Sequence, residues 1–145
     1  MLRGDLIVWR NLIFAPFSEE WVFRCCMCSL LLAGGWSPFW TIVCAPLFFG
    51  LAHLHHLRVK PWQAVVGQFG YTTLFGWIAS YYFVRTRYFL APTVAHAFCN
   101  HMGFPRLDLI GQSKHPGVIK AGFVVGLLGF LWTISLLTDP DHYPW

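Results

Sequence analysis

The stretch Cys25–Leu57, CCMCSLLLAGGWSPFWTIVCAPLFFGLAHLHHL, decides the fold because its 33 residues include no Asp, Glu, Lys or Arg. A single membrane-crossing helix needs only about 20 apolar residues, so this run is too long for one span. The segment GGWSP, at residues 34–38, interrupts it with residue types that break helices. The stretch therefore predicts two consecutive helices, over about residues 19–33 and 38–57.

Three further runs without Asp, Glu, Lys or Arg follow, over residues 62–84, 88–104 and 121–138. A shorter apolar segment over residues 6–17 precedes them all and is expected to end or bend near Pro16. No internal repeat or linker divides the chain. We therefore predict an all-α fold, a polytopic membrane helix bundle of about five transmembrane helices, forming one domain over residues 1–145.

The composition agrees with this class. Hydrophobic residues make up 57% of the chain and charged residues only 11%, whereas about 25% is usual in soluble domains. Such a chain is too apolar for intrinsic disorder and has too few polar side chains to cover a soluble surface. The net charge is +4, but the basic residues are scattered between apolar runs, so we expect no nucleic acid as a partner.

The basic residues instead predict the orientation in the membrane. If every predicted helix crosses once, one side carries most of them, and the positive-inside rule makes that side cytoplasmic. These residues are Arg3, Arg10, Arg58, Lys60, Arg106, Lys114 and Lys120.

The two glutamates of the chain are adjacent, and ionisable residues at an apolar helix are candidates for function. Ser18 is expected to cap a helix that places Glu19 and Glu20 in its first turn. Glu20 and Arg24 lie four residues apart on one helical face and are expected to pair. Glu19 points about 100° away from Glu20 and is left free for chemistry.

Two further helices carry polar residues in apolar surroundings. His53 lies near the end of the predicted second helix, with Phe49 one turn before it on the same face. His96 and Asn100 are four residues apart on another helix, and both side chains can donate hydrogen bonds. Donors of this kind can form an oxyanion hole for a tetrahedral intermediate.

The predicted topology places Glu19, His53, His96 and Asn100 in the cytoplasmic half of the bundle, so one shared site is possible. Glu19 and His53 could then share a water molecule, because a poorly solvated carboxylate is a better base. A base, a water and oxyanion donors together are typical of a peptidase or another acyl-transfer hydrolase.

Two alternative chemistries stay open. Cys99 follows His96 by three residues and could act as a nucleophile, although a cysteine in an apolar segment more often serves packing. His53 and His56 could bind zinc together with a glutamate, but the His-Glu-x-x-His motif is absent. We predict a site without metal or cofactor.

The three motifs Glu19-Glu20-x-x-x-Arg24, Phe49-x-x-x-His53 and His96-x-x-x-Asn100, in this order, resemble the type II CAAX prenyl protease family, within the wider CPBP family of membrane proteins. The resemblance extends over nearly the whole chain. It implies that Glu19 activates water with help from His53, that His96 and Asn100 stabilise the oxyanion, and that Glu20, Arg24 and Phe49 support them.

The resemblance also implies a place and a substrate. The expected enzyme lies in the endoplasmic reticulum membrane, with its site toward the cytoplasm. It removes the last three residues from farnesylated or geranylgeranylated CAAX proteins such as small GTPases. Family members usually have about eight membrane helices, so this chain is expected to be N-terminally shortened. Two alternatives remain at this stage: a CPBP-family protease with an unrelated substrate, and a catalytically inactive membrane-interaction protein.

Overall fold

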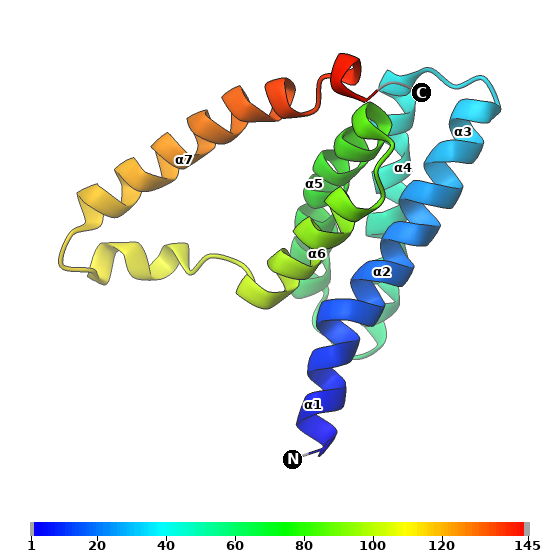
Figure 1. Ribbon diagram of the computed structural model, residues 1–145. Coiled ribbons are helices and arrows are strands. Elements are labelled where there is room, and N and C mark those ends of the chain that lie inside the picture. Colours follow the sequence, from blue (N-terminus) through cyan, green and yellow to red (C-terminus); the bar gives the residue numbers. More distant parts are fainter. Residues whose placement is uncertain (1, 144–145) are drawn as a thin grey trace. The chain divides into compact units, whose positions relative to one another are not determined.

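The computed structural model describes residues 2–143, and the side chains of residues 5–143; the side chain of Arg3, part of the topology prediction, lies outside them. Every regular element in this part of the chain is a helix, which confirms the all-α class. The chain divides into two compact units, Met1–His101 and Met102–Trp145. The helices of both units are drawn in Figure 1.

The first unit holds most of the helices. Its elements, with η marking π-helical or 3₁₀ segments, are α1 (Leu2–Trp9), η1 (Arg10–Phe14), α2 (Ala15–Glu20), η2 (Trp21–Cys28), α3 (Ser29–Ala33), α4 (Pro38–Ala52), η3 (His53–Arg58), α5 (Trp62–Thr86) and α6 (Leu90–Met102).

The elements from α1 to α3 follow one another without interruption, and Figure 1 shows them as one long helical rod. A helix end near Pro16 is therefore wrong, whereas a bend there stays a prediction. The π-helical segment η1 lies directly before this proline, and the Ala15 N–H bonds to the Arg10 carbonyl, five residues back. A π-turn is wider than an α-turn, so the proline ring and its missing N–H are accommodated within a continuous helix.

The same continuity overturns the expected cap at Ser18. Its hydroxyl donates to the Phe14 carbonyl oxygen at 2.7 Å and lies 3.1 Å from that of Ala15. This is the back-bonding pattern of a serine inside a helix rather than at its start. Glu19 and Glu20 consequently lie within the rod, at the end of α2, and not in the first turn of a new helix.

The break predicted at residues 34–38 is confirmed. Gly35 adopts a φ of 88°, which glycine reaches without a steric penalty. Ser37 then caps α4, because its hydroxyl accepts the Trp40 N–H at 3.3 Å. Pro38 occupies the first turn of α4, where its missing N–H needs no partner.

Helices α4 and α5 lie side by side and form the most extensive packing between elements in the first unit. Gly50 of α4 permits this close approach, because a Cβ there would overlap Thr73 Oγ1 and lie 3.0 Å from ring carbons of Phe69. A small core joins both helices to the rod through Cys28, Ala45 and Phe83.

Helix α6 joins the first unit through aromatic contacts with the rod. The Phe89 ring, just before α6, lies edge-on to Phe17 at 5.0 Å and to Trp21 at 5.7 Å between centroids. Edge-to-face pairs of this kind add to the stabilisation from buried area. They hold the start of α6 beside α2 and η2, where the glutamates lie.

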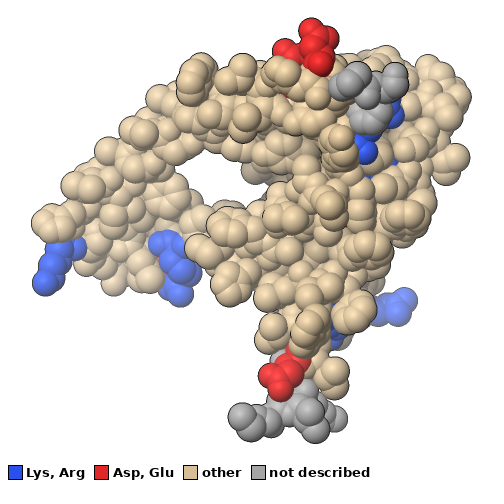
Figure 2. Space-filling view, viewed as in Figure 1, with Lys and Arg blue, Asp and Glu red and all other residues tan. Residues whose placement is uncertain are grey.

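Two segments among the described residues are long and apolar enough to cross a membrane, Pro38–Arg58 and Pro116–Leu137. On the face drawn in Figure 2, most of the surface is uncharged. Both observations agree with a membrane helix bundle. The count of about five transmembrane helices stays a prediction.

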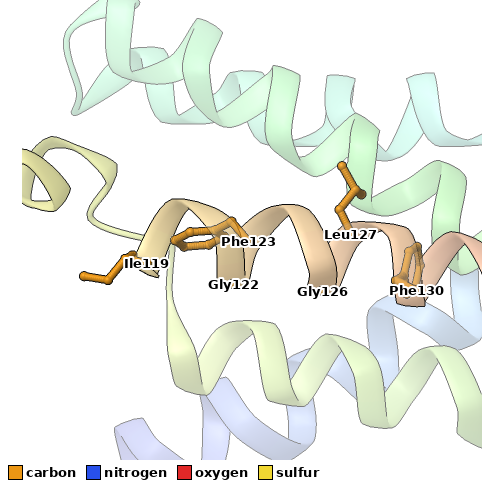
Figure 3. Close-up of a pocket in the computed structure, with 6 residues that line it drawn as sticks. All are labelled: Ile119, Gly122, Phe123, Gly126, Leu127 and Phe130. Atoms are coloured by element: carbon orange, nitrogen blue, oxygen red, sulfur yellow. The ribbon is translucent and has the colours of Figure 1, made fainter. Parts of the chain in front are cut away.

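The second unit consists of η4 (Leu107–Gln112), α7 (Pro116–Leu137) and η5 (Pro140–His142). One face of α7 forms a shallow groove lined by Gly122, Phe123, Gly126 and their neighbours (Figure 3). Arg106, directly before η4, donates two hydrogen bonds to Asp108, at 3.0 and 2.8 Å, and this holds the pKa of the Asp108 carboxyl below its usual value.

The close approach of α4 to α5 gives a test of the fold. We expect Gly50→Ala to lower the free energy of unfolding by about 1–3 kcal/mol, because the added methyl overpacks the contact with Thr73 and Phe69. Thermal unfolding in detergent measures this change. Gly67→Ala on α5 is the matched control, since a Cβ there meets no atom within 4 Å. Equal stability of the two variants would contradict the packing.

Candidate active site

The centre of the site is a buried ion pair along the rod. Arg24 Nη1 lies 3.0 Å from Glu20 Oε1, and both side chains are almost completely inaccessible to solvent. The spacing of four residues predicted this pair, and the structure confirms it. A second arginine nitrogen, Nη2, donates to the Gly76 carbonyl oxygen of α5 at 3.3 Å. The ion pair therefore ties the rod to α5.

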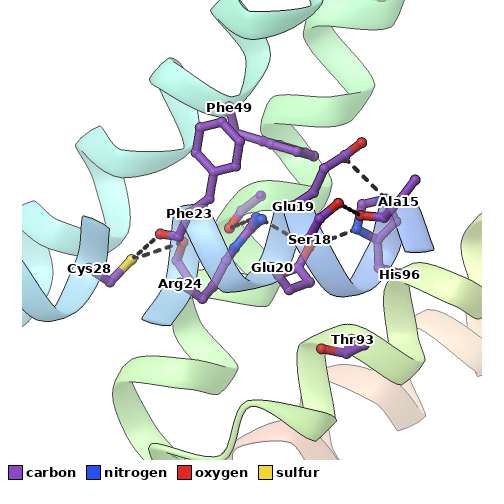
Figure 4. Close-up of polar contacts among 12 residues, drawn as sticks. Ala15, Ser18, Glu19, Glu20, Phe23, Arg24, Cys28, Phe49, Thr93 and His96 are labelled. Carbon is purple, nitrogen blue, oxygen red and sulfur yellow. Dashed lines mark hydrogen bonds and ion pairs between the residues drawn. The ribbon is translucent and has the colours of Figure 1, made fainter. Parts of the chain in front are cut away.

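His96 brings α6 into the same network. Its Nδ1 lies 2.7 Å from Glu20 Oε1, the oxygen that also accepts from Arg24 (Figure 4). An ionised carboxylate can only accept hydrogen bonds, so Nδ1 of His96 carries the proton in this contact. The other ring nitrogen, Nε2, is thereby left to face the rest of the site.

Glu19 lies on the other side of the His96 ring. Its Oε2 atom is 3.7 Å from His96 Nε2, and 34% of its side chain is exposed. The histidine therefore stands between a buried carboxylate at Nδ1 and an accessible carboxylate at Nε2 (Figure 4). Of the two glutamates, Glu19 is the one with a partly exposed side chain.

Phe49 fills the space between Arg24, His53 and His96. The Arg24 Cζ atom lies 4.7 Å from the centre of the Phe49 ring. The ring of His53 lies edge-on to Phe49 at 5.1 Å and that of His96 at 6.0 Å. An arginine over an aromatic face is attracted by it, and more strongly where water is excluded.

His53 begins η3, directly after α4. Its Nδ1 lies 2.9 Å from the Phe49 carbonyl oxygen, which can only accept, so Nδ1 carries the proton. The free Nε2 of the neutral ring is then an acceptor. His53 is half-buried, and Phe49 is the residue that links it to His96.

Asn100 lies one turn after His96 on α6 and is exposed. Its Nδ2 donates to the Asn11 carbonyl oxygen at 3.0 Å. An amide nitrogen carries two hydrogens. One N–H makes this contact, and the second can donate a further hydrogen bond. The contact fixes the far end of α6 against η1.

The structure thus gathers Glu19, Glu20, Arg24, Phe49 and His96 into one connected cluster, with His53 attached through Phe49. Asn100 lies beside it, one helical turn away. Sequence reasoning missed Phe75, whose ring lies 4.9 Å from that of His96, and the Gly76 carbonyl. Both belong to the uncharged run over residues 62–84, where no pattern of residue types distinguishes them.

The residues of the two alternative chemistries, Cys99 and His56, lie as follows. Cys99 is an exposed free thiol on α6. His56 Nδ1 bonds to Gln68 Oε1 at 2.9 Å. Among the described residues, no three His, Cys, Asp or Glu side chains come together as a metal-binding group.

Fold and site together define an all-helical membrane protein with an accessible carboxylate facing a histidine that a buried ion pair holds in place. The family described as "Type II CAAX prenyl endopeptidase Rce1-like" matches residues 5–102. The chain belongs to this family, which agrees with the resemblance noted from its motifs. No solved structure matches the chain.

Curated relatives match almost the whole chain. It is 42% identical to CAAX prenyl protease 2 of Arabidopsis thaliana, over 97% of this chain and 47% of the relative. It is 39% identical to the probable CAAX prenyl protease 2 of Schizosaccharomyces pombe, over 96% and 55%. The human CAAX prenyl protease 2 is 37% identical, over 96% and 45%. The chain spans about half the length of these relatives.

The buried pair gives a test of the network. We expect Arg24→Met to lower the free energy of unfolding by about 3–5 kcal/mol, because Glu20 is then a buried charge without its cation. Adding Glu20→Gln should recover part of the loss, since the amide oxygen still accepts from His96 and no charge remains. Chemical unfolding of the full chain in detergent measures both.

The exposed pair between Arg106 and Asp108 provides the control. Its side chains are 70% and 61% exposed, so Arg106→Met should leave the unfolding transition unchanged. A similar small effect for Arg24→Met, or no recovery in the double variant, would contradict the structural role of the buried pair.

Proposed function

We propose that the chain is an intramembrane endopeptidase that removes the C-terminal three residues of prenylated CAAX proteins. The observation that carries the proposal is the accessible Glu19 carboxylate, 3.7 Å from the Nε2 of a histidine anchored on a buried ion pair. Relatives that match nearly all of the chain are named CAAX prenyl protease 2, and this supports the substrate class.

Glu19 is the proposed general base. A water molecule could hydrogen-bond both Glu19 Oε2 and His96 Nε2, at about 2.8 Å from each, because these atoms are close enough to share it. Glu19 takes a proton from this water while the oxygen of the water attacks the carbonyl carbon of the scissile peptide bond. Collapse of the tetrahedral intermediate breaks the C–N bond, and the proton passes to the leaving amine.

His53 is the proposed assistant in this step. Its Nδ1–H is engaged by the Phe49 carbonyl, so the neutral ring offers Nε2 as a second acceptor for a proton from water. A histidine held in one tautomer by a backbone carbonyl is ready for this role without reorganisation. Its attachment to Phe49 keeps it at the same end of the cluster as His96.

His96 and Asn100 are the proposed oxyanion donors. Asn100 has one N–H left after its bond to Asn11. His96 already donates Nδ1–H to Glu20, so it can also donate from Nε2 only when the ring is doubly protonated. The Nδ1–H bond to Glu20 fixes this ring within the site. This role therefore makes oxyanion stabilisation dependent on Glu20 as well as on His96.

The substrates and the location extend the proposal. Farnesylated or geranylgeranylated small GTPases fit an enzyme that meets a peptide at the membrane surface while the prenyl chain stays in lipid. We place the protein in the endoplasmic reticulum membrane as a multi-pass protein, with the site toward the cytoplasm. The largely uncharged face drawn in Figure 2 supports a membrane location, and the basic residues between the apolar runs support the orientation.

Cleavage of a farnesylated CAAX peptide by the full chain in liposomes tests the activity. We expect Glu19→Gln to lower kcat/KM by about 100-fold or more, because the amide cannot take a proton, and His53→Ala to lower it as well. Mass spectrometry of the released tripeptide measures the rates. Asp5→Asn is the matched control for the loss of one acid from the same rod and should cleave normally.

Equal rates for the wild type, Glu19→Gln and His53→Ala would remove both residues from the mechanism. If the correctly inserted wild-type chain releases no tripeptide, the proposed activity is wrong, and an inactive membrane-interaction protein is the better description. Cleavage of an unprenylated peptide at the same rate would instead favour a protease with another substrate.

Metal removal is a separate test of the water-activation step. With a carboxylate as the base, we expect the cleavage rate to be unchanged after dialysis against a strong chelator. His56→Ala should also cleave at the wild-type rate. A loss of activity on chelation that zinc restores would support the metal site at His53, His56 and a glutamate instead.

A further inference from the structure

Phe75 of α5 contacts two members of the site, although no motif contains it. Its ring lies 4.9 Å from the ring of His96, with an angle of 53° between the planes. The Arg24 Cζ atom is 5.8 Å from the centre of the same ring. Phe75 therefore packs against the histidine and the guanidinium at the point where the rod, α5 and α6 meet.

The next residue fixes the position of Phe75. The Gly76 carbonyl accepts a hydrogen bond from Arg24 Nη2 at 3.3 Å. A Cβ at Gly76 would lie 2.7 Å from the Pro46 Cβ and 3.3 Å from Arg24 Nη2, so only glycine fits this space. Because α5 is held here by both a hydrogen bond and close packing, the backbone that carries the Phe75 ring has little freedom.

The His96 ring needs such a contact. One hydrogen bond at Nδ1 fixes that nitrogen but leaves the ring free to tilt about the bond. Packing against the ring removes this freedom and so sets the direction of Nε2, which faces Glu19 at 3.7 Å. Phe49 meets the same ring nearly at a right angle, 84° between planes, so the two phenylalanines restrain different tilts.

We propose that Phe75 is a positioning residue that directs His96 Nε2 toward Glu19. The catalytic consequence rests on the proposed peptidase function, whereas the orientation of His96 does not. Phe75 touches no reacting atom in this role. It acts through His96, so its loss should affect the rate of the chemical step and leave substrate binding nearly unchanged.

Steady-state cleavage by the full chain tests the catalytic consequence. We expect Phe75→Leu to lower kcat by about 10- to 100-fold, the effect of a small misplacement of a reacting group, with KM within about twofold. Phe75→Tyr, which keeps the ring, should restore most of kcat. If Phe75→Leu fails to fold, Phe75→Met replaces it, because its flexible chain fills the same space without a planar ring.

Phe83→Leu is the matched control on the same helix. Phe83 is buried, 5% exposed, and packs in the core with Cys28 and Ala45 rather than in the site. Its substitution should lower stability and leave kcat unchanged. Wild-type kcat in Phe75→Leu, or an equal loss in Phe83→Leu, would overturn the positioning role.

Histidine-selective nitrogen NMR in detergent micelles gives a readout that needs no activity. The His96 signals are assigned by their loss in His96→Gln. We expect Phe75→Leu to shift or broaden them, and Phe83→Leu to leave them in place. Unchanged His96 signals in Phe75→Leu would overturn the proposal even if the wild type cleaves no peptide. Absence of cleavage with the expected NMR change would reject the proposed function alone.

Discussion

The buried pair of Glu20 and Arg24 is the interaction on which the rest of the site depends. Removing two charges from water costs several kcal/mol for each ion, and their attraction alone does not offset this. The structure surrounds the pair with further partners: His96 on the carboxylate, the Gly76 carbonyl on the guanidinium, and Phe49 beneath it. Each partner comes from a different helix, so the charges can be buried only when α2, α4, α5 and α6 are assembled.

This dependence divides the work between the two adjacent glutamates. Glu20 is inaccessible, and its Oε1 atom accepts from both Arg24 and His96. Glu19 does not bind Arg24, and about a third of its side chain is exposed. Successive residues of a helix point about 100° apart, so a single dipeptide supplies one acid for the interior and one for the site. His96 lies between them, so Glu20 fixes the position of the ring that faces Glu19.

The sequence predicted those parts of the site that local geometry determines. The Glu20–Arg24 pair follows from helical spacing, and the break before Pro38 follows from its glycines. The contact between His96 and Glu20 joins residues 76 positions apart, and only the packing of α6 against the rod creates it. The expected cap at Ser18 failed because the π-turn of η1 carries the helix past Pro16, which residue propensities do not reveal. Phe75 could not be found because the chain contains fourteen phenylalanines, many of them exposed or packed outside the site.

The π-helical segment η2, Trp21–Cys28, bears on how this site can change over evolutionary time. A π-turn holds one residue more than an α-turn, and such turns are frequent at functional sites. Losing one residue there can be absorbed by tightening the turn to α, while the residues on either side keep their directions. A change in the number of residues just after the glutamates therefore need not change the direction in which the flanking side chains point. The rod can lose a residue beyond Arg24 without turning its acids away from His96.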